Sequence, residues 1–172
     1  MRFHEYFTAQ EMEILRQRAN RLAENNTSTH RITQSALRVV IGHENYALPI
    51  GTLASVYEGA SIVPIPCTPE HILGVTNMRG HVIPVLNLSH LLHVTDEAVG
   101  IYVIVASHEE SMIGMVVASV GDIVNYADDE IMPLTGETQR WVKGVLMDGT
   151  ILLDLQALLS DPILIVLDTS VS

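Results

Sequence analysis

The chain has 172 residues and a formal net charge of −11; 48% of the residues are hydrophobic and 5% are aromatic. This apolar content supports a packed core and excludes a disordered chain, and the negative charge argues against nucleic acid or an anionic membrane as the main partner. The one cysteine, Cys67, excludes an intramolecular disulfide, and the longest apolar runs are too short to span a bilayer. We therefore expect a cytoplasmic protein without direct membrane insertion.

Residues 8–25 have the pattern of an amphipathic helix that begins with a capping box, because Thr8 and Glu11 have the required spacing. Four apolar residues recur on one face of this helix: Met12, Leu15, Ala19 and Leu22. We expect this face to pack on the rest of the chain, with a contact to a partner helix as the alternative. The polar segment 25–30 is predicted to be a linker, so residues 1–34 form an N-terminal helical extension.

From residue 36 onward the sequence has the pattern of short β-strands bounded by turns. In chain order we predict a hairpin over 37–50 that turns at His43-Glu44-Asn45, a strand over 53–58, an irregular or edge segment over 63–72, a hairpin that turns at Met78-Arg79-Gly80-His81, and a short helix over 88–94.

This pattern occurs twice in the chain. Residues 101–124 resemble 37–58, with His43-Glu44 matching His108-Glu109, and residues 143–159 resemble the hairpin and helix that follow. Two copies of one unit, about 35–95 and 99–160, therefore make up a domain over 35–160. Units this small tend to close their edges as barrels, so we expect a mainly β fold of two small β-barrels packed side by side. Residues 161–172 follow as a tail or an added strand.

The two copies differ at one turn, where Arg79-Gly80 of the first copy matches Asp148-Gly149 of the second. Asp148-Gly149 is typical of a two-residue primed hairpin turn. If both turns occupy the same position, the scaffold does not require an arginine. This comparison favours a contact role for Arg79 over that of a solvated turn residue.

The sequence has none of the phosphate-binding loops or nucleophile elbows that identify common enzyme classes. Its one metal-like pattern is His90-x-x-His93, which lacks evident third and fourth ligands and is replaced by Ala157 and Ser160 in the second copy. We therefore predict no enzyme activity, no cofactor and no metal. A metal-binding protein that uses His90 and His93 is the remote alternative.

Three stretches resemble the signatures of CheW-like domains: GVTNMRGHVIPVLNL (74–88), IPCTPEHILGV (65–75) and WVKGVLMDGTILLDLQALL (141–159). The resemblance implies two intertwined five-stranded SH3-like β-barrels with short helices. It also implies a non-catalytic adaptor in bacterial chemotaxis signal transduction. Such an adaptor couples the cytoplasmic tip of a methyl-accepting chemoreceptor to the regulatory domain of a CheA-type histidine kinase, in arrays on the inner face of the membrane.

In this family a groove between the barrels binds the receptor tip, and the arginine of an Asn-Leu-Arg-Gly turn lies beside this groove. The resemblance maps this role onto six residues: Arg79 with its neighbours Asn77, Met78 and Gly80, and Leu53 and Val56 on the preceding strand. Ser55 departs from the family pattern, which often has a glutamate there. The alternative is therefore a regulatory module of a divergent pilus-motility or phototaxis system that binds the kinase without a classical receptor.

Overall fold

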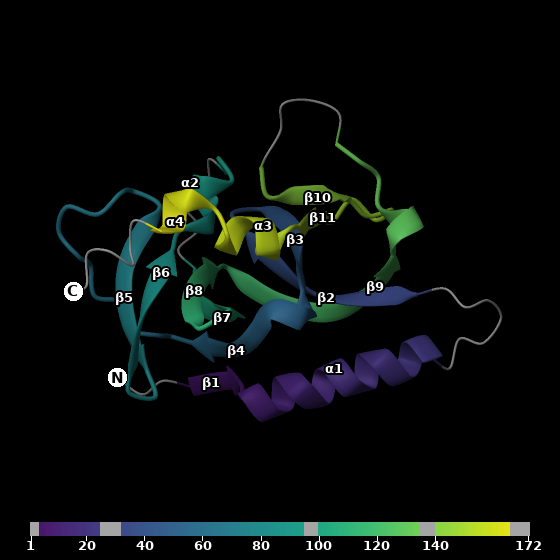
Figure 1. Cartoon of the computed structure of the whole chain (residues 1–172), viewed down its shortest axis with the longest axis horizontal. Coiled ribbons are helices and arrows are strands. Elements are labelled where there is room, and N and C mark those ends of the chain that lie inside the picture. Colours follow the sequence, from purple (N-terminus) through teal and green to yellow (C-terminus); the bar gives the residue numbers. More distant parts are fainter. Residues whose placement is uncertain (1–3, 25–31, 95–99, 135–139, 166–172) are drawn as a thin grey trace.

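The computed structural model describes residues 4–24, 32–94, 100–134 and 140–165, and it is mainly β, as predicted (Figure 1). In chain order the elements are β1 (His4–Phe7), α1 (Ala9–Glu24), β2 (Thr33–Ile41), β3 (Glu44–Pro49), η1 (Ile50–Thr52), β4 (Leu53–Glu58), β5 (Ile72–Met78), β6 (His81–Leu86), α2 (Leu88–Leu91), β7 (Tyr102–His108), β8 (Ser111–Val117), β9 (Ser119–Ala127), η2 (Asp128–Glu130), β10 (Val142–Val145), β11 (Ile151–Leu153), α3 (Leu155–Leu159) and α4 (Pro162–Ile165).

The strands form two sheets with the same internal order. The first sheet runs β1-β4-β7-β8-β6-β5 and the second runs β10-β11-β3-β2-β9. Without β1, each sheet has five strands, and each contains one parallel pair, β6 with β8 and β11 with β3. Among the described residues, no strand pairing joins the two edge strands of either sheet, so neither sheet closes into a barrel. Each is a curled sheet with the strand count of the predicted barrel.

Each sheet is built from both copies of the repeat. The first sheet combines β4, β5 and β6 of the first copy with β7 and β8 of the second, and the second sheet combines β2 and β3 with β9, β10 and β11. The predicted intertwined arrangement is therefore confirmed. Figure 1 shows the two sheets side by side, connected by chain segments that cross between them.

Three apolar clusters account for the packing. One cluster lies inside the first sheet and includes Tyr57 and Val105, and a second lies inside the other sheet and includes Tyr126 and Leu152. The largest cluster contains residues of both sheets and of α1, α2, α3 and α4. Because burial of apolar surface is the main stabilising term in folding, this shared core joins the two sheets into one unit.

The N-terminal helix forms where the sequence predicts it. The Thr8 amide donates to Glu11 Oε2 at 2.6 Å and the Glu11 amide donates to Thr8 Oγ1 at 3.1 Å, which confirms the capping box. Met12 and Ala19 are buried and Leu15 is partly buried against the shared core, so the apolar face packs on the rest of the chain. The side chain of Leu22 and the predicted linker lie outside the described residues.

Two hairpin turns differ from the prediction. Ile41 pairs with Glu44 and His108 pairs with Ser111, so the two turns are Gly42-His43 and Glu109-Glu110. The first residue of each turn has a positive φ, 62° and 54°. The predicted turn at His43-Glu44-Asn45 is therefore wrong, because the turn begins one residue earlier. The match of His43-Glu44 with His108-Glu109 is also wrong, since the equivalent turns are Gly42-His43 and Glu109-Glu110. The two turns share a backbone geometry and not the same residue types.

The chain after α3 is held by a buried carboxylate. Asp161 Oδ2 accepts a hydrogen bond from Trp141 Nε1 at 2.8 Å, and Asp161 Oδ1 accepts one from the Ile163 amide at 3.0 Å. Leu164 of α4 is buried in the shared core. Residues 162–165 are helical, so the alternative of an added strand is wrong for this part, and residues 166–172 lie outside the description.

Candidate partner-binding surface

The β5–β6 hairpin carries the turn that the sequence singles out. Met78 pairs directly with His81, so Arg79 and Gly80 form a two-residue turn, and both have a positive φ, 53° and 85°. This geometry is that of a type I′ turn, which favours Asn and Gly. An arginine in the left-handed region costs about 1 kcal/mol relative to a glycine there.

The residues around Arg79 have different structural roles. Asn77 is exposed, and its Oδ1 accepts a hydrogen bond from the Gly80 amide at 2.9 Å, which holds the turn. Met78 is buried in the cluster inside the first sheet and anchors the hairpin. Arg79 and Gly80 are exposed. Of the four predicted turn residues, three therefore lie at the surface and one fixes the turn to the core.

The sequence analysis missed Val82, which pairs with Asn77 and is 66% exposed. It lies beside the turn on the returning strand, whereas Ile83 and Val85 point into the core. No sequence signal distinguishes it, because Val82, Ile83 and Val85 are all apolar β-branched residues and only the packing determines which of them faces solvent. We call residues 77 and 79–82 the turn surface.

Leu53 and Val56 lie elsewhere, because both side chains are fully buried in the shared core. Their strand, β4, has β7 on one side and β1 on the other. Ser55, which departs from the family pattern, is also buried. The side chains of Leu53 and Val56 therefore belong to the core and are not part of the turn surface. Their role in partner binding stays a prediction.

The turn of the second copy has a different geometry. The Gly149 amide donates to the Leu146 carbonyl at 2.9 Å, the Leu146 amide donates to the Thr150 carbonyl at 2.8 Å, and Gly149 has a φ of 86°. This pattern is a three-residue loop in which only the glycine adopts the left-handed region. The prediction of a two-residue primed turn at Asp148-Gly149 is therefore wrong.

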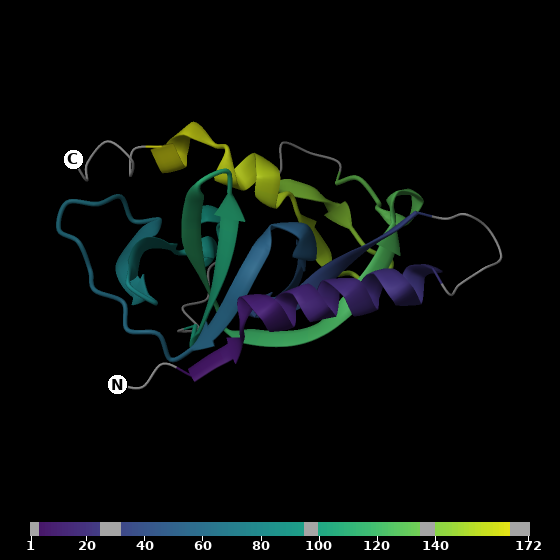
Figure 2. The ribbon, with the colours of Figure 1, turned by 60° about the horizontal axis from the view of Figure 1, so that its bottom comes forward.

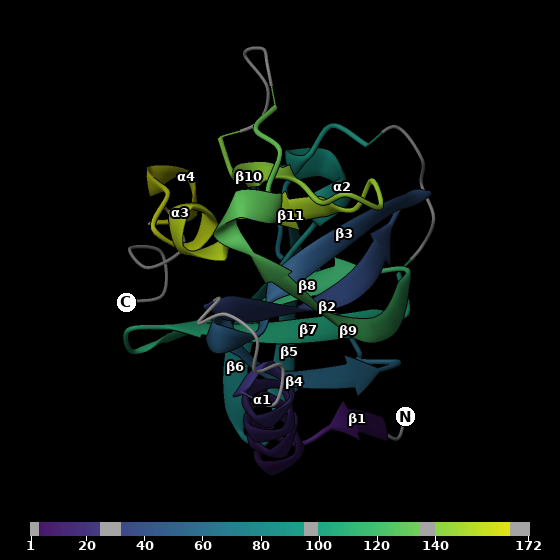
Figure 3. The same ribbon diagram turned by 90° about the vertical axis from the view of Figure 1, so that its right-hand side faces the viewer.

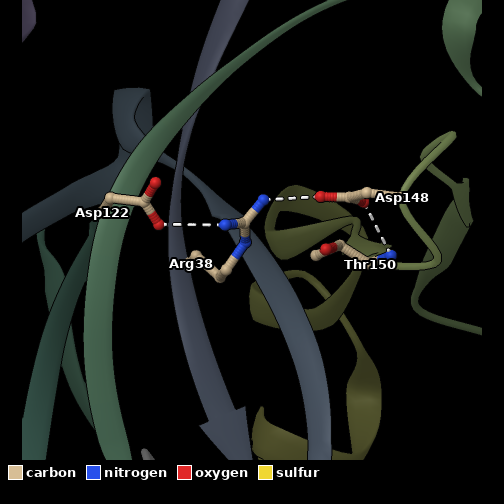
Figure 4. A network of polar contacts seen from close by, with 4 residues as sticks. All are labelled: Arg38, Asp122, Asp148 and Thr150. Atoms are coloured by element: carbon tan, nitrogen blue, oxygen red, sulfur yellow. Dashed lines mark hydrogen bonds and ion pairs between the residues drawn. The ribbon is translucent and has the colours of Figure 1, made fainter.

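Asp148 stabilises this loop through a hydrogen bond and an ion pair (Figure 4). Its Oδ1 accepts from the Thr150 amide at 3.0 Å, and its Oδ2 lies 2.5 Å from an Arg38 nitrogen. Arg38 also pairs with Asp122 at 3.1 Å, so its guanidinium links β2, β9 and the β10–β11 loop. The Thr150 amide and, to a smaller extent, Arg38 hold the pKa of Asp148 below its usual value.

The two turns are also not at equivalent positions. Gly74 pairs with Val85 in the first copy and Gly144 with Leu152 in the second, and the first hairpin is three residues longer between these pairs. Arg79 therefore lies farther out than the Asp148 loop. The predicted equivalence of the turns is wrong, and the contact role of Arg79, which is exposed and has a positive φ, stays a prediction.

The two histidines of the metal-like pattern are both exposed. His90 Nε2 lies 3.7 Å from Glu70 Oε2, and His93 has a positive φ of 54° at the end of α2. Within the described ranges, no group of three or more His, Cys, Asp or Glu side chains is placed to hold a metal ion. The arrangement therefore offers one long His90–Glu70 contact and no set of metal ligands among the described residues.

The comparison with protein families decides the identity of the domain. The model of the CheW-like domain matches residues 35–162. The chain belongs to the CheW-like family. The chemotaxis protein CheW of Treponema pallidum is 27% identical over 134 residues, which cover 70% of this chain and 78% of that protein. The CheW of Rhizobium meliloti is 28% identical over 112 residues, 62% of this chain and 72% of that protein.

A solved CheW structure supports the fold. The scaffolding protein TtCheW from Thermoanaerobacter tengcongensis has a TM-score of 0.63 and 24% identity, covering 71% of this chain and 88% of that one. CheW-like proteins are non-enzymatic adaptors or scaffolds of chemotaxis signalling, which agrees with the predicted class. In the described part of the chain, no helix is long and apolar enough to cross a membrane. The match begins at residue 35, so β1 and α1 lie outside the family domain.

Proposed function

We propose that this chain is a cytoplasmic adaptor that couples the tip of a methyl-accepting chemoreceptor to the regulatory domain of a CheA-type histidine kinase. Membership of the CheW-like family supports the adaptor role. The observation that carries the receptor contact is Arg79, an exposed cation in a strained I′ turn. A guanidinium in this position can form charge-assisted hydrogen bonds with a carboxylate or a helix C-terminus of the partner.

The turn surface has the composition of a small contact site. Val82 supplies an exposed apolar group beside the cation, and Asn77 fixes the turn that presents both. Interfaces commonly combine an apolar centre with an arginine that makes directed hydrogen bonds. Leu53 and Val56 are proposed to contribute through the position of β4, since their side chains are buried.

The test is the affinity of the full chain for a purified receptor-tip hairpin and, separately, for the kinase regulatory domain. Arg79→Asp removes a charge-assisted contact worth about 1.5–3 kcal/mol, so receptor affinity should fall about 10- to 150-fold. Lys143→Asp is the matched control, because Lys143 is an exposed cation on β10 that undergoes the same charge change. Receptor affinity that falls equally in both variants would assign the effect to net charge and refute the role of Arg79.

A second candidate is a kinase-binding module without a classical receptor, as in pilus motility or phototaxis. It is favoured by one observation: Ser55, Leu53 and Val56 are all buried, and the β4 edge beside them is occupied by β1. This candidate predicts binding to the kinase domain and no binding to the receptor tip. The same two affinities therefore separate the two functions.

A further inference from the structure

The N-terminal arm, defined as β1 and α1 over residues 4–24, is an addition to the CheW-like domain that covers one of its sheet edges. β1 pairs antiparallel with β4 through His4↔Glu58, Glu5↔Tyr57 and Phe7↔Val56. Without this arm, β4 would be an edge strand of the first sheet, with unpaired backbone N–H and C=O groups. The arm therefore covers an edge that residues 35–162 of this chain, the part matched by the family model, would leave unpaired.

The helix of the arm lies across both sheets. α1 contacts β4 of the first sheet and β2 and β9 of the second, and Figure 2 shows it running along one side of the molecule. Met12 and Ala19 of α1 are buried against these strands. The junction between the sheets thus forms a seat for one face of an amphipathic helix, and α1 demonstrates that a helix fits there.

One side chain of the arm makes directed contacts with this seat. Arg16 Nε donates to the Ile50 carbonyl at 3.2 Å, and its terminal NH2 group donates to the Leu53 carbonyl. These carbonyls lie on η1 and at the start of β4. A helix that replaced α1 would need apolar residues at the same spacing and a donor that reaches the same two oxygens.

The covered seat lies at the same end of the molecule as the turn surface. In Figures 1 and 3 the β5–β6 hairpin extends toward the end where β1 and α1 lie. β4, which carries Leu53 and Val56, lies under the arm. In the strand order β7 and β8 separate β4 from the β5–β6 hairpin, but Tyr57 of β4 and Met78 at the base of the turn belong to the same apolar cluster. A helical partner that bound the turn surface and extended along β4 would therefore meet the arm.

We infer that the N-terminal arm is an internal occupant of the helix-binding seat, and that it must be displaced before the receptor-tip helix packs against β4 and the junction of the sheets. This inference rests on the proposed function. The arm is held by a short strand with a bulge between Glu5 and Phe7, by one apolar stripe and by Arg16. The fraction of molecules with the arm released then scales the apparent receptor affinity.

The experiment locks and unlocks the arm in the full chain. His4→Cys with Glu58→Cys, in a Cys67→Ser background, joins a directly paired position of β1 and β4, where antiparallel Cα spacing suits a disulfide. Affinity for the receptor-tip hairpin is measured before and after oxidation. We expect oxidation to lower it at least tenfold, dithiothreitol to restore it, and affinity for the kinase domain to stay unchanged.

Two further variants make the outcome specific. Ser107→Cys with Met112→Cys, in the same Cys67→Ser background, places the same bond between β7 and β8 at exposed positions, and oxidation there should leave receptor affinity unchanged. Arg16→Ala loosens the arm and should raise receptor affinity several-fold. Equal affinity of the locked and unlocked arm, or a rise on locking, overturns the inference alone. Absence of receptor binding in every form overturns the receptor role in the proposed function, and the inference with it.

Discussion

Asp161 is a buried carboxylate, and its removal should clearly lower the free energy of unfolding. It is 7% exposed and accepts hydrogen bonds from Trp141 Nε1 and the Ile163 amide. In Asp161→Ala the buried indole N–H is left without this acceptor, at a cost of about 1–3 kcal/mol, and the lost bond to Ile163 adds about 1 kcal/mol. Arg140, whose side chain is 69% exposed, adds little. The total is about 2–4 kcal/mol, or a fall in Tm of about 4–15 °C for a chain of this size.

The assay uses the fluorescence of Trp141, which is the single tryptophan of the chain. Urea unfolding at pH 7 is followed by this emission and, in parallel, by circular dichroism, which reports the sheets. Both probes should give the same reduced stability, because Leu164 and Trp141 belong to the shared core. Wild-type unfolding midpoints in Asp161→Ala would refute the assignment of the carboxylate as a structural anchor.

The same residue gives a pH dependence with a defined sign. The hydrogen bond from the Ile163 amide is the main reason that the pKa of Asp161 lies below its usual value in the folded chain. Its contribution is therefore complete above the unfolded-state pKa of about 4 and is lost as the pH falls through the lower folded value. The stability difference between wild type and Asp161→Ala should narrow below about pH 4, and a difference that grew in acid would contradict this.

Three further predictions concern the hairpins. Gly74→Ala should destabilise by about 3 kcal/mol in urea unfolding, because its φ is 148° and a Cβ there would lie 2.1 Å from a backbone oxygen, whereas Gly121→Ala should cost much less. A double-mutant cycle of Arg38→Ala and Asp148→Asn should give a coupling of about 0.5–1 kcal/mol, since both side chains are partly exposed, and no coupling would refute the ion pair. Arg79→Gly should raise stability by about 1 kcal/mol while it weakens receptor binding, and a loss of stability would refute the strain.

Local features of the fold follow from the sequence where one residue determines one contact. The capping box of Thr8 and Glu11 is such a feature, and so is the burial of Met12 and Ala19 on one helical face. The internal repeat also predicts the strands. It does not predict that the strands of the two copies mix, because an alternating pattern determines which face of a strand is buried and not which strand is its neighbour. That part came from the family resemblance alone.

The site is less predictable, because it depends on turn geometry and on distant segments. Arg79-Gly80 and Asp148-Gly149 look equivalent as dipeptides, yet one forms a two-residue turn and the other belongs to a three-residue loop in a shorter hairpin. The outward position of Val82 and the cover that β1 places over β4 depend on tertiary packing. No local pattern contains that information.

The mixing of strands between the sheets bears on how such a chain can be divided. A half-length chain that ended after α2 would hold β2 and β3 for one sheet and β4, β5 and β6 for the other, and it could complete neither. Two such halves would complete both sheets by exchanging strands. The chain is thus the covalent equivalent of a strand-exchanged dimer, in which the connection from α2 to β7 replaces association by a high effective concentration. The folding of this chain should be independent of protein concentration, and its two sheets should unfold as one cooperative unit.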